Sequence, residues 1–401
     1  MSDPASAIQN GSANGRRLGV MFVGAGGAVA STVVAGVLAA RGGAAEPLGM
    51  LTEDRRWEPL HLLTLDGLSF GGWDISREDL EGATRRHGVV PSPLIEAIGD
   101  DLAAVLPLPG VADSGRASAE RLIDDIDRFR LKAGVHDVVV VCLSSTAPPV
   151  DLSLPVFQHL DSFELGLDAA DPAIPVDAVY AYAALCSGCA VLNFTPNVSV
   201  EVPALLELAD NMSLPVAGKD GKTGQTLVKT VIAPMLAMRE LRVEGWYSTN
   251  ILGNNDGKVL SDPEHVRSKI ETKSGVLEGI LGRSDFSHLV RIDYFPPQGD
   301  AKEAWDNILF RGWLGERMSM RIDWQGKDSI LAAPLIVDIV RLLDLARRQG
   351  CSGVQQQLGC FFKAPYQSAE HNFFRQYETL VAYLEQSLEA AVPVAAGAEA
   401  G

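Results

Sequence analysis

The sequence predicts an α/β protein in which a parallel-sheet, dinucleotide-binding domain is interrupted by an inserted α+β domain. Three observations support this prediction. The chain opens with a short apolar run that ends in glycines and continues into a segment of helical length. Further apolar runs follow at 138–142 and 190–193, with helical patterns before them, and the pattern changes after Thr226. Alternating strand and helix patterns imply a parallel sheet that is buried on both faces. With 401 residues, 47% of them hydrophobic, the chain is long enough for two or more domains.

The opening unit reads as a strand, a glycine turn and a helix. Residues 18–23 are apolar, Gly24 and Gly26 make a tight turn, and residues 28–41 are small and apolar over a helical length. Such a turn lets the backbone approach a pyrophosphate, to which the helix N-terminus offers free N–H groups and a positive dipole end. The third glycine of the G-x-G-x-x-G pattern falls at Val29, so a purely structural strand, turn and helix is an alternative.

A carboxylate that binds the ribose of a dinucleotide is expected about 20 residues after the turn, and none is obvious there. Glu53 and Asp54 lie somewhat further on, and Asp74 follows in Gly72-Trp73-Asp74-Ile75. Asp74 has two interpretations, a cofactor ligand or part of a helix N-terminal cap region ahead of Arg77.

The remaining patterns predict that the chain leaves the first domain and later returns to it. Helical patterns cover 117–133 and 227–242, strand character marks 242–248 and 288–294, and an apolar helical stretch covers 330–347. We expect the first part of the parallel-sheet domain at 18–226, an inserted catalytic domain at 227–326, a return at 327–391, and disordered tails at 1–17 and 392–401.

Two segments concentrate groups that bind phosphates and sugars. Lys219 and Lys222 precede Thr223-Gly224-Gln225-Thr226, which runs directly into a helical pattern. This arrangement predicts either a phosphate cradle or a well-capped helix. The run of amides and carboxylate at 250–257 suits either plain turns or the recognition of sugar hydroxyls.

Three further lysines are candidates for catalysis. Lys269 and Lys273 are four residues apart and share one face if their segment is helical, although a solvated basic face is an alternative. Lys363 follows Phe361 and Phe362, whose side chains are expected to desolvate it and lower its pKa. Snorkelling of Lys363 from a packed helix end is the other interpretation.

Composition excludes several classes of function. The net charge of −17 repels phosphate backbones and anionic lipids, so we expect no nucleic-acid partner and no membrane partner. The chain has no apolar run of the ~18 residues that a membrane span needs, and residues 1–17 lack the apolar core of a signal peptide.

Five cysteines, few and odd in number, predict reduced thiols in the cytoplasm. The C-x-x-C spacing of Cys186 and Cys189 has no second pair or His cluster, so we expect a packing role and no metal.

Taken together, the motifs resemble those of inositol-1-phosphate synthases over nearly the whole chain. The blocks at 252–257 and 328–334 are the most specific. The matching blocks, in their order along the chain, are Gly24-Ala25-Gly26-Gly27 with Ser31-Thr32, Gly72-Trp73-Asp74-Ile75, Asn193-Phe194-Thr195-Pro196-Asn197, Gly224-Gln225-Thr226, Leu252-Gly253-Asn254-Asn255-Asp256-Gly257, Ser268-Lys269, Lys273-Ser274, Gly299-Asp300, Asp328-Ser329-Ile330-Leu331-Ala332-Ala333-Pro334 and Lys363-Ala364-Pro365.

The resemblance implies an NAD-binding Rossmann domain interrupted by a catalytic domain that also builds a homotetramer. It implies a hexose 6-phosphate substrate, glucose 6-phosphate, and a cyclitol phosphate product. In that family NAD oxidises C5 of the open-chain sugar, enolisation follows, C6 attacks the C1 aldehyde in an aldol addition, and the NADH still bound reduces the C5 ketone. Each step develops negative charge on an oxygen, which fixed ammonium groups stabilise.

The resemblance also implies roles for individual residues. Lys269, Lys273 and Lys363 would be the catalytic cations, with Asp220 beside the nicotinamide and Asp328 as a supporting carboxylate. The implied NAD-binding residues are Gly24, Gly26, Gly27, Ala28, Val29, Asp74, Ser145, Thr146, Asn193, Asp220 and Asp328. The implied phosphate-binding residues are Thr223, Gly224, Gln225, Thr226, Leu252 through its backbone, Asn254 and Lys273.

The chain departs from the family pattern at three positions. Asp293 stands where eukaryotic-type members have a lysine, and Arg291 lies two residues away, where it would pair with Asp293 on one face of a strand. Lys219-Asp220 stands where those members have two aspartates, so Lys219 could return a positive charge to the neighbourhood. Leu227 stands where they have a lysine.

These departures leave alternative functions open. A shifted anion site would suit fructose 6-phosphate, whose C2 carbonyl would give a five-membered ring. A plain NAD-dependent sugar-phosphate dehydrogenase would need the glycine turn but not the lysines and the amide loop together. A non-enzymatic sensor of NAD or sugar phosphate is the third alternative.

Overall fold

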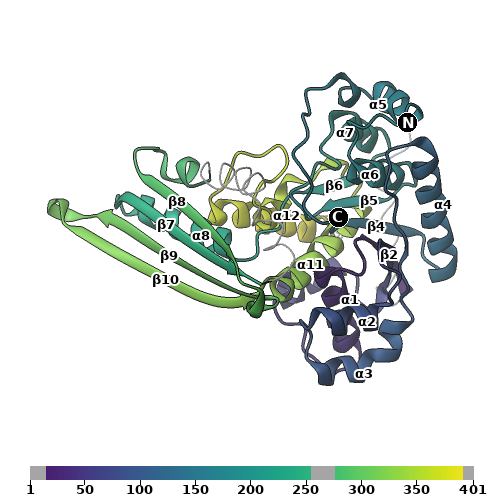
Figure 1. Cartoon of the computed structure of the whole chain (residues 1–401), viewed down its shortest axis with the longest axis horizontal. Coiled ribbons are helices and arrows are strands. Elements are labelled where there is room, and N and C mark those ends of the chain that lie inside the picture. Colours follow the sequence, from purple (N-terminus) through teal and green to yellow (C-terminus); the bar gives the residue numbers. More distant parts are fainter. Residues whose placement is uncertain (1–14, 254–275, 392–401) are drawn as a thin grey trace, which may run out of the picture.

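The structure, a computed structural model of the chain, describes residues 15–253 and 276–391. Within these residues the strands form two sheets, one of seven parallel strands and one of four strands (Figure 1). The strand order of the larger sheet, β11-β6-β5-β4-β1-β2-β3, is that of a Rossmann fold and confirms the predicted α/β class. Its strands are β1 (Leu18–Val23), β2 (Leu68–Asp74), β3 (Leu108–Pro109), β4 (Asp137–Cys142), β5 (Ala190–Asn193), β6 (Pro215–Gly218) and β11 (Gly353–Val354).

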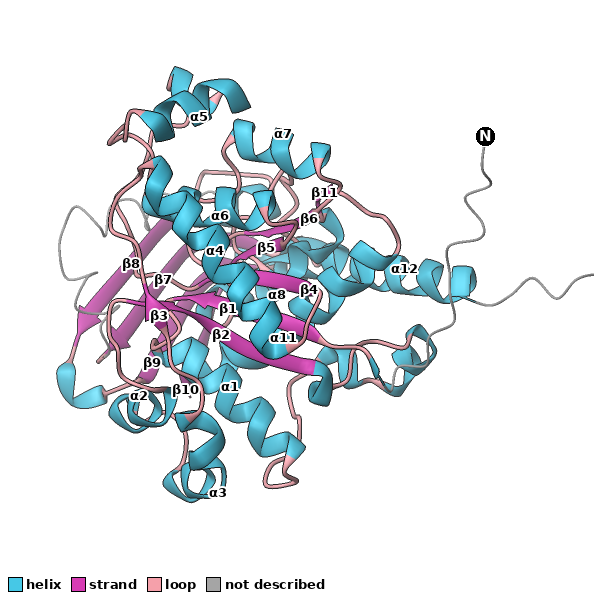
Figure 2. Cartoon of the chain, turned by 90° about the vertical axis from the view of Figure 1, so that its right-hand side faces the viewer, coloured by secondary structure: helices cyan, strands magenta, loops and turns pink. Residues whose placement is uncertain are grey.

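Helices cover both faces of the larger sheet (Figure 2). Side chains alternate between the faces along each strand, so Val20 and Phe22 of β1 pack in one core while Met21 and Val23 pack in the other. This double burial explains why the strands read as continuous apolar runs. The helices of one core are α1 (Ala28–Arg41), α2 (Leu80–His87), α3 (Ser92–Ala103), α11 (Asp328–Arg348) and α12 (Phe373–Ala391), and those of the other are α4 (Arg116–Ala133), α5 (Leu160–Asp168), α6 (Val176–Cys186) and α7 (Pro203–Asn211).

The smaller sheet has the order β10-β9-β7-β8. Its strands are β7 (Arg242–Leu252), β8 (Ser287–Tyr294), β9 (Ala301–Arg311) and β10 (Arg317–Lys327). Helix α8 (Gln225–Met238) packs on one face, where Ala233 and Leu236 meet Trp246, Ile308 and Phe310. The β9–β10 hairpin was not among the strands singled out from the sequence. The division of the chain into domains at 226 and 326 stays a prediction; β7, β8 and β9 fall between those positions, and β10 ends one residue beyond the second.

The chain enters and leaves the smaller sheet through two helices. Helix α8 leads from β6 into β7, and α11 leads from β10 back to the larger sheet, where it packs beside α1. Near the start of the described chain, the Arg16 guanidinium pairs with the Asp344 carboxylate of α11 at 2.5 Å. None of the helices in the described ranges is both long and apolar enough to cross a bilayer.

Candidate active site

The glycine turn lies where β1, β2 and β4 end. The N–H groups of Gly24 and Ala25 donate to the Trp73 carbonyl oxygen at 2.8 and 3.0 Å. Gly24 has a φ of +90°, and a Cβ built there would lie 2.8 Å from the Leu143 carbonyl oxygen, so only glycine fits this position. The turn sits between β2 and β4, at the switch point where a Rossmann sheet binds its ligand.

Helix α1 begins directly after the turn and directs its N-terminus to the same place. Its first intrahelical bond runs from the Ser31 N–H to the Gly27 carbonyl oxygen at 3.0 Å. The N–H groups of Ala28, Val29 and Ala30 precede that bond and are therefore left for a ligand. Two adjacent phosphates are well suited to such a helix start.

The structure separates the three candidate carboxylates for the ribose. Asp74 ends β2, and its carboxylate accepts hydrogen bonds from the N–H groups of Gly26 and Ser76, both at 2.8 Å. Glu53 pairs instead with Arg341, and Asp54 caps a short 3-10 helix. The N-cap of α2 is Asp79, whose carboxylate accepts from the Gly82 N–H at 2.9 Å. Asp74 is thus the carboxylate that lies at the glycine turn.

The loop after β4 carries Ser145 and Thr146 to the same edge of the sheet. Asn197 donates to the Ser145 carbonyl oxygen at 2.9 Å and accepts from the Ala147 N–H at 2.8 Å, which fixes this loop. Asn193 is fully buried and donates to the Asn197 carbonyl oxygen at 2.8 Å. Asn193 therefore supports the loop from below, and its direct contact with a cofactor stays a prediction.

Two lysines and two aspartates meet at the carboxyl edge of the larger sheet, and we call Asp220, Lys302, Asp328 and Lys363 the lysine–aspartate cluster. The Lys363 ammonium lies 2.7 Å from Asp220 Oδ1, and the Lys302 ammonium lies 2.9 Å from Asp328 Oδ2. Asp220 follows β6, Lys302 belongs to β9, and Asp328 begins α11. Three of these residues are predicted site residues, and the fourth, Lys302, was not predicted although it lies only two positions after the family block at Gly299-Asp300.

The charges in this cluster act on one another. Burial opposes the ionisation of Asp328, but the positive charges of Lys302 and Lys363, with a hydrogen bond from Thr223, hold its pKa below its ordinary value. Asp328 is therefore a carboxylate at neutral pH. Fixed ammonium groups of this kind stabilise oxyanions that form during a reaction.

The predicted phosphate segment adjoins the cluster. The Thr223 hydroxyl donates to Asp328 Oδ1 at 3.3 Å, and a Cβ built on Gly224 would lie 2.5 Å from the Trp324 ring. The Gln225 side chain is buried and hydrogen-bonded to Asp306 and Asn250, which anchors the start of α8, and its contact with a phosphate stays a prediction. Thr226 is the next residue of α8 and is also buried, and Leu252 ends β7. The backbone N–H groups at the start of α8 are the donors that this segment offers.

The structure places two of the departing residues away from the cluster. The Lys219 ammonium lies 2.6 Å from Glu201 Oε1, so the positive charge that it brings is neutralised there. Arg291 and Asp293 pair at 2.9 Å, as the sequence predicted. Strand register puts Asp293 beside Ile251, on the sheet face opposite to that of Leu252 and Lys302.

Three predicted site residues, Asn254, Lys269 and Lys273, lie outside the described residues. Within the described ranges there is no group of three His, Cys, Asp or Glu side chains that could hold a metal ion. Cys186 and Cys189 are free thiols, and burial raises the pKa of Cys189 to about 12.

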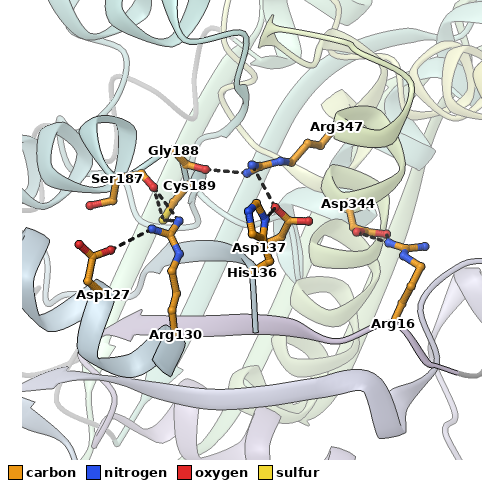
Figure 3. A network of polar contacts seen from close by, with 10 residues as sticks. All are labelled: Arg16, Asp127, Arg130, His136, Asp137, Ser187, Gly188, Cys189, Asp344 and Arg347. Carbon is orange, nitrogen blue, oxygen red and sulfur yellow. Dashed lines mark hydrogen bonds and ion pairs between the residues drawn. The ribbon is translucent and has the colours of Figure 1, made fainter. Parts of the chain in front are cut away.

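A hollow of about 580 Å³ lies at the opposite end of the larger sheet, beside the start of β4. Figure 3 shows the polar contacts around it. Arg130 donates to the Ser187 carbonyl oxygen and Arg347 to the Gly188 carbonyl oxygen, both at 2.6 Å, so both arginines cap the C-terminus of α6. Helix capping explains these arginines, and the hollow is not part of the candidate site.

The Rossmann sheet has a glycine turn at its switch point, and at the same edge two lysines are ion-paired with aspartates. These features define a dinucleotide-dependent enzyme. The family model of myo-inositol-1-phosphate synthase, which is named for NAD binding, matches residues 57–385. The chain is 37% identical to inositol-3-phosphate synthase 1 of Bacteroides thetaiotaomicron over 88% of this chain and 91% of that protein. It is 30% identical to inositol-3-phosphate synthase of Spirodela polyrhiza, with coverage of 83% and 75%. The chain belongs to the myo-inositol-1-phosphate synthase family.

Solved structures agree on the fold. Inositol-3-phosphate synthase of Caenorhabditis elegans superposes with a TM-score of 0.85 at 24% identity, covering 96% of this chain and 90% of that one. A myo-inositol-1-phosphate synthase-related protein of Thermotoga maritima gives a TM-score of 0.75 at 23% identity, with coverage of 92% and 99%.

NAD is the cofactor of this enzyme, and the described residues fit it. The turn at Gly24 and Gly26 leaves no side chain between the backbone and a pyrophosphate. The first N–H groups of α1 point to the same place, and Asp74 stands at the end of β2, where a Rossmann fold binds the ribose.

Proposed function

We propose that the protein converts glucose 6-phosphate to a myo-inositol phosphate by internal oxidation, enolisation, intramolecular aldol addition and reduction. The single observation that carries this proposal is the lysine–aspartate cluster, which lies at the same sheet edge as the glycine turn. The names of the relatives at 37% and 30% identity support an inositol phosphate as the product.

The proposed chemistry assigns tasks to residues of the cluster. Bound NAD supplies reversible oxidation and reduction at a carbinol carbon of the substrate. The Lys363 ammonium, held by Asp220, stabilises the negative charge that develops on substrate oxygens. Asp328 holds the Lys302 ammonium in an ion pair, and the positive charges of Lys302 and Lys363 favour its ionised form. Lys269 and Lys273 are proposed as further cations of the same site.

The proposed phosphate site is the start of α8 together with the end of β7. Thr223, Gly224 and Thr226 bring backbone N–H and hydroxyl groups to one helix N-terminus, which favours an anion. Gln225 holds this segment on the smaller sheet through Asp306. Backbone donation by Leu252 and side-chain donation by Asn254 and Lys273 complete the proposed site.

We also propose that the protein assembles as a homotetramer through the smaller sheet. The sheet face that α8 does not cover carries the exposed apolar side chains of Leu289, Trp305 and Leu309. Leu289 lies on β8 and the other two on β9, the strands that flank β7, and large apolar residues exposed on one sheet face form the kind of surface that a partner covers. The five cysteines are all free, which agrees with a reducing compartment such as the cytoplasm.

The experiment that tests the substrate is a parallel incubation of the protein and NAD with glucose 6-phosphate or fructose 6-phosphate, followed by phosphorus NMR. A new cyclitol phosphate signal from glucose 6-phosphate is the expected result. A product from fructose 6-phosphate alone would replace the proposal with a five-membered-ring cyclase. Absence of product from both sugars would contradict cyclisation of either substrate.

A further inference from the structure

Lys302 is a nearly buried cation that joins the two sheets. It is the second residue of β9, and its side chain is 14% exposed. Its ammonium reaches from the smaller sheet to Asp328 Oδ2, 2.9 Å away, at the start of the helix that returns to the larger sheet. This ion pair accounts for the burial of Lys302, because lysines are rarely buried unless they are paired.

The phosphate segment surrounds Lys302 on two sides. In the register of β7 and β9, Lys302 lies directly opposite Leu252, the last residue of β7. Its partner Asp328 accepts a hydrogen bond from Thr223 at 3.3 Å, and a Cβ built on Gly224 would lie 3.7 Å from the same carboxylate. Lys302 is therefore a neighbour of the residues that are proposed to hold the phosphate.

The ammonium of Lys302 retains capacity to bind a ligand. A lysine has three N–H donors. Asp328 takes one of them, and among the described residues no other acceptor contacts Lys302. The Lys219 ammonium differs, because Glu201 holds it at 2.6 Å on the Tyr366 side of the fold. Asp293 offers no positive charge and forms an ion pair with Arg291.

We propose that Lys302 is a substrate-binding residue whose ammonium contacts the phosphate group of the sugar phosphate, while Asp328 holds it in place. This inference rests on the proposed function and names a cation for its phosphate site. An ammonium–phosphate contact is a charge-assisted hydrogen bond, which is stronger than a contact between neutral groups.

The test replaces Lys302 and measures binding separately from turnover. Lys302→Met keeps the aliphatic stem and removes the charge, and Lys302→Arg restores a cation. Lys302→Met is expected to raise both the KM for glucose 6-phosphate and the inhibition constant of inorganic phosphate about tenfold or more. The affinity for NAD should stay within about twofold, and Lys302→Arg should recover most of the loss. Lys132→Met, an exposed lysine of α4, is the matched control and should change neither constant.

The outcomes separate this inference from the proposed function. An unchanged KM and phosphate inhibition constant in Lys302→Met, or a fall in kcat alone, would overturn the phosphate contact. If Lys302→Met does not fold, as judged by thermal unfolding, Lys302→Gln and Lys302→Arg are compared with each other by the same criteria. If the wild type does not convert glucose 6-phosphate, the proposed function fails. Calorimetric binding of inorganic phosphate to the NAD-loaded protein and its Lys302 variants then still tests the inference.

Discussion

Asp328 joins the lysine–aspartate cluster to the predicted phosphate segment, since it accepts from both Lys302 and Thr223. Asp328→Asn keeps the shape of the side chain but removes the charge that holds the Lys302 ammonium. We expect kcat to fall by about 10²-fold, the usual effect of losing one electrostatic contact in an active site. Steady-state kinetics on Asp328→Asn and on Asp323→Asn, an exposed aspartate of β10, measure this effect. Equal losses in the two variants would contradict the special position of Asp328.

A substitution at Gly24 tests the cofactor site, also at the scale of a single residue. Gly24→Ala places a methyl group 2.8 Å from the Leu143 carbonyl oxygen in a backbone with φ of +90°. We expect a loss of about 1–3 kcal/mol in the free energy of unfolding from the strained backbone, together with weaker NAD binding. Gly36→Ala is the control, because nothing lies within 4 Å of a Cβ built there and alanine favours the helix. Chemical denaturation and NAD titration of both variants check this prediction.

Three residues of the lysine–aspartate cluster could be predicted from the sequence, and Lys302 could not. Glycine turns and family blocks mark Gly24, Asp220 and Lys363, because the chemistry of each is visible in its neighbours along the chain. Lys302 stands in a charged stretch, and only the pairing of β9 with β7 brings it to Asp328. A contact between strands that are distant in sequence leaves no local signal.

At the scale of elements, α8 carries a buried lysine one helical turn after Gln225. Lys229 is 2% exposed, and its ammonium lies 3.0 Å from His288 Nε2. Burial lowers the pKa of Lys229 to about 8, although the charge of Asp306 opposes this shift. The helix therefore holds a lysine whose charged form is less stable in the folded protein than in the unfolded chain.

The sign of the pH dependence follows from that shift. Below pH 8 Lys229 is protonated in both states, and the folded state bears the full penalty of the buried charge. Between pH 8 and 10.5 the unfolded chain binds more protons at this site, so the folded state gains stability as pH rises. Lys229→Met lacks this contribution. We expect the stability of Lys229→Met relative to wild type to decrease by about 1–2 kcal/mol from pH 8 to pH 10, measured by urea unfolding. A constant difference would contradict the shifted pKa.

The β9–β10 hairpin shows which elements local patterns miss. Residues Ala304, Ile308 and Phe310 of β9 point into the core beneath α8, as a strand period of two requires. Asp306 occupies the same face, fully buried, and accepts hydrogen bonds from Trp246 and Ser248. A carboxylate at a core position breaks the apolar alternation, so the strand pattern is obscured in the sequence. The opening strand and helix have no such interruption and were predicted to the residue.

At the scale of the whole molecule, the uncovered face of the smaller sheet predicts assembly. Trp305→Glu puts a charge at the centre of that face and should dissociate a homotetramer into smaller species. Light scattering after size-exclusion chromatography measures the mass. Leu131→Glu, at an exposed apolar position of α4, is the control and should leave the mass unchanged. A wild-type monomer would contradict the proposed assembly.

The order in which the chain forms the larger sheet and then the smaller one was predictable, because apolar β/α runs and family blocks follow one another along the sequence. The packing of the smaller sheet on α8 was not, since it depends on the buried polar contacts of Gln225, Asn250 and Asp306. Polar residues in a core look like surface residues until their partners are known.

The most direct test of the account is the balance between product and cofactor. The protein is incubated with excess glucose 6-phosphate and a limiting amount of NAD, while phosphorus NMR counts the cyclitol phosphate and absorbance counts NADH. Redox-neutral cyclisation predicts many equivalents of product for each NAD and no accumulation of NADH. One equivalent of NADH for each sugar oxidised, with no cyclic product, would contradict it and identify a plain dehydrogenase.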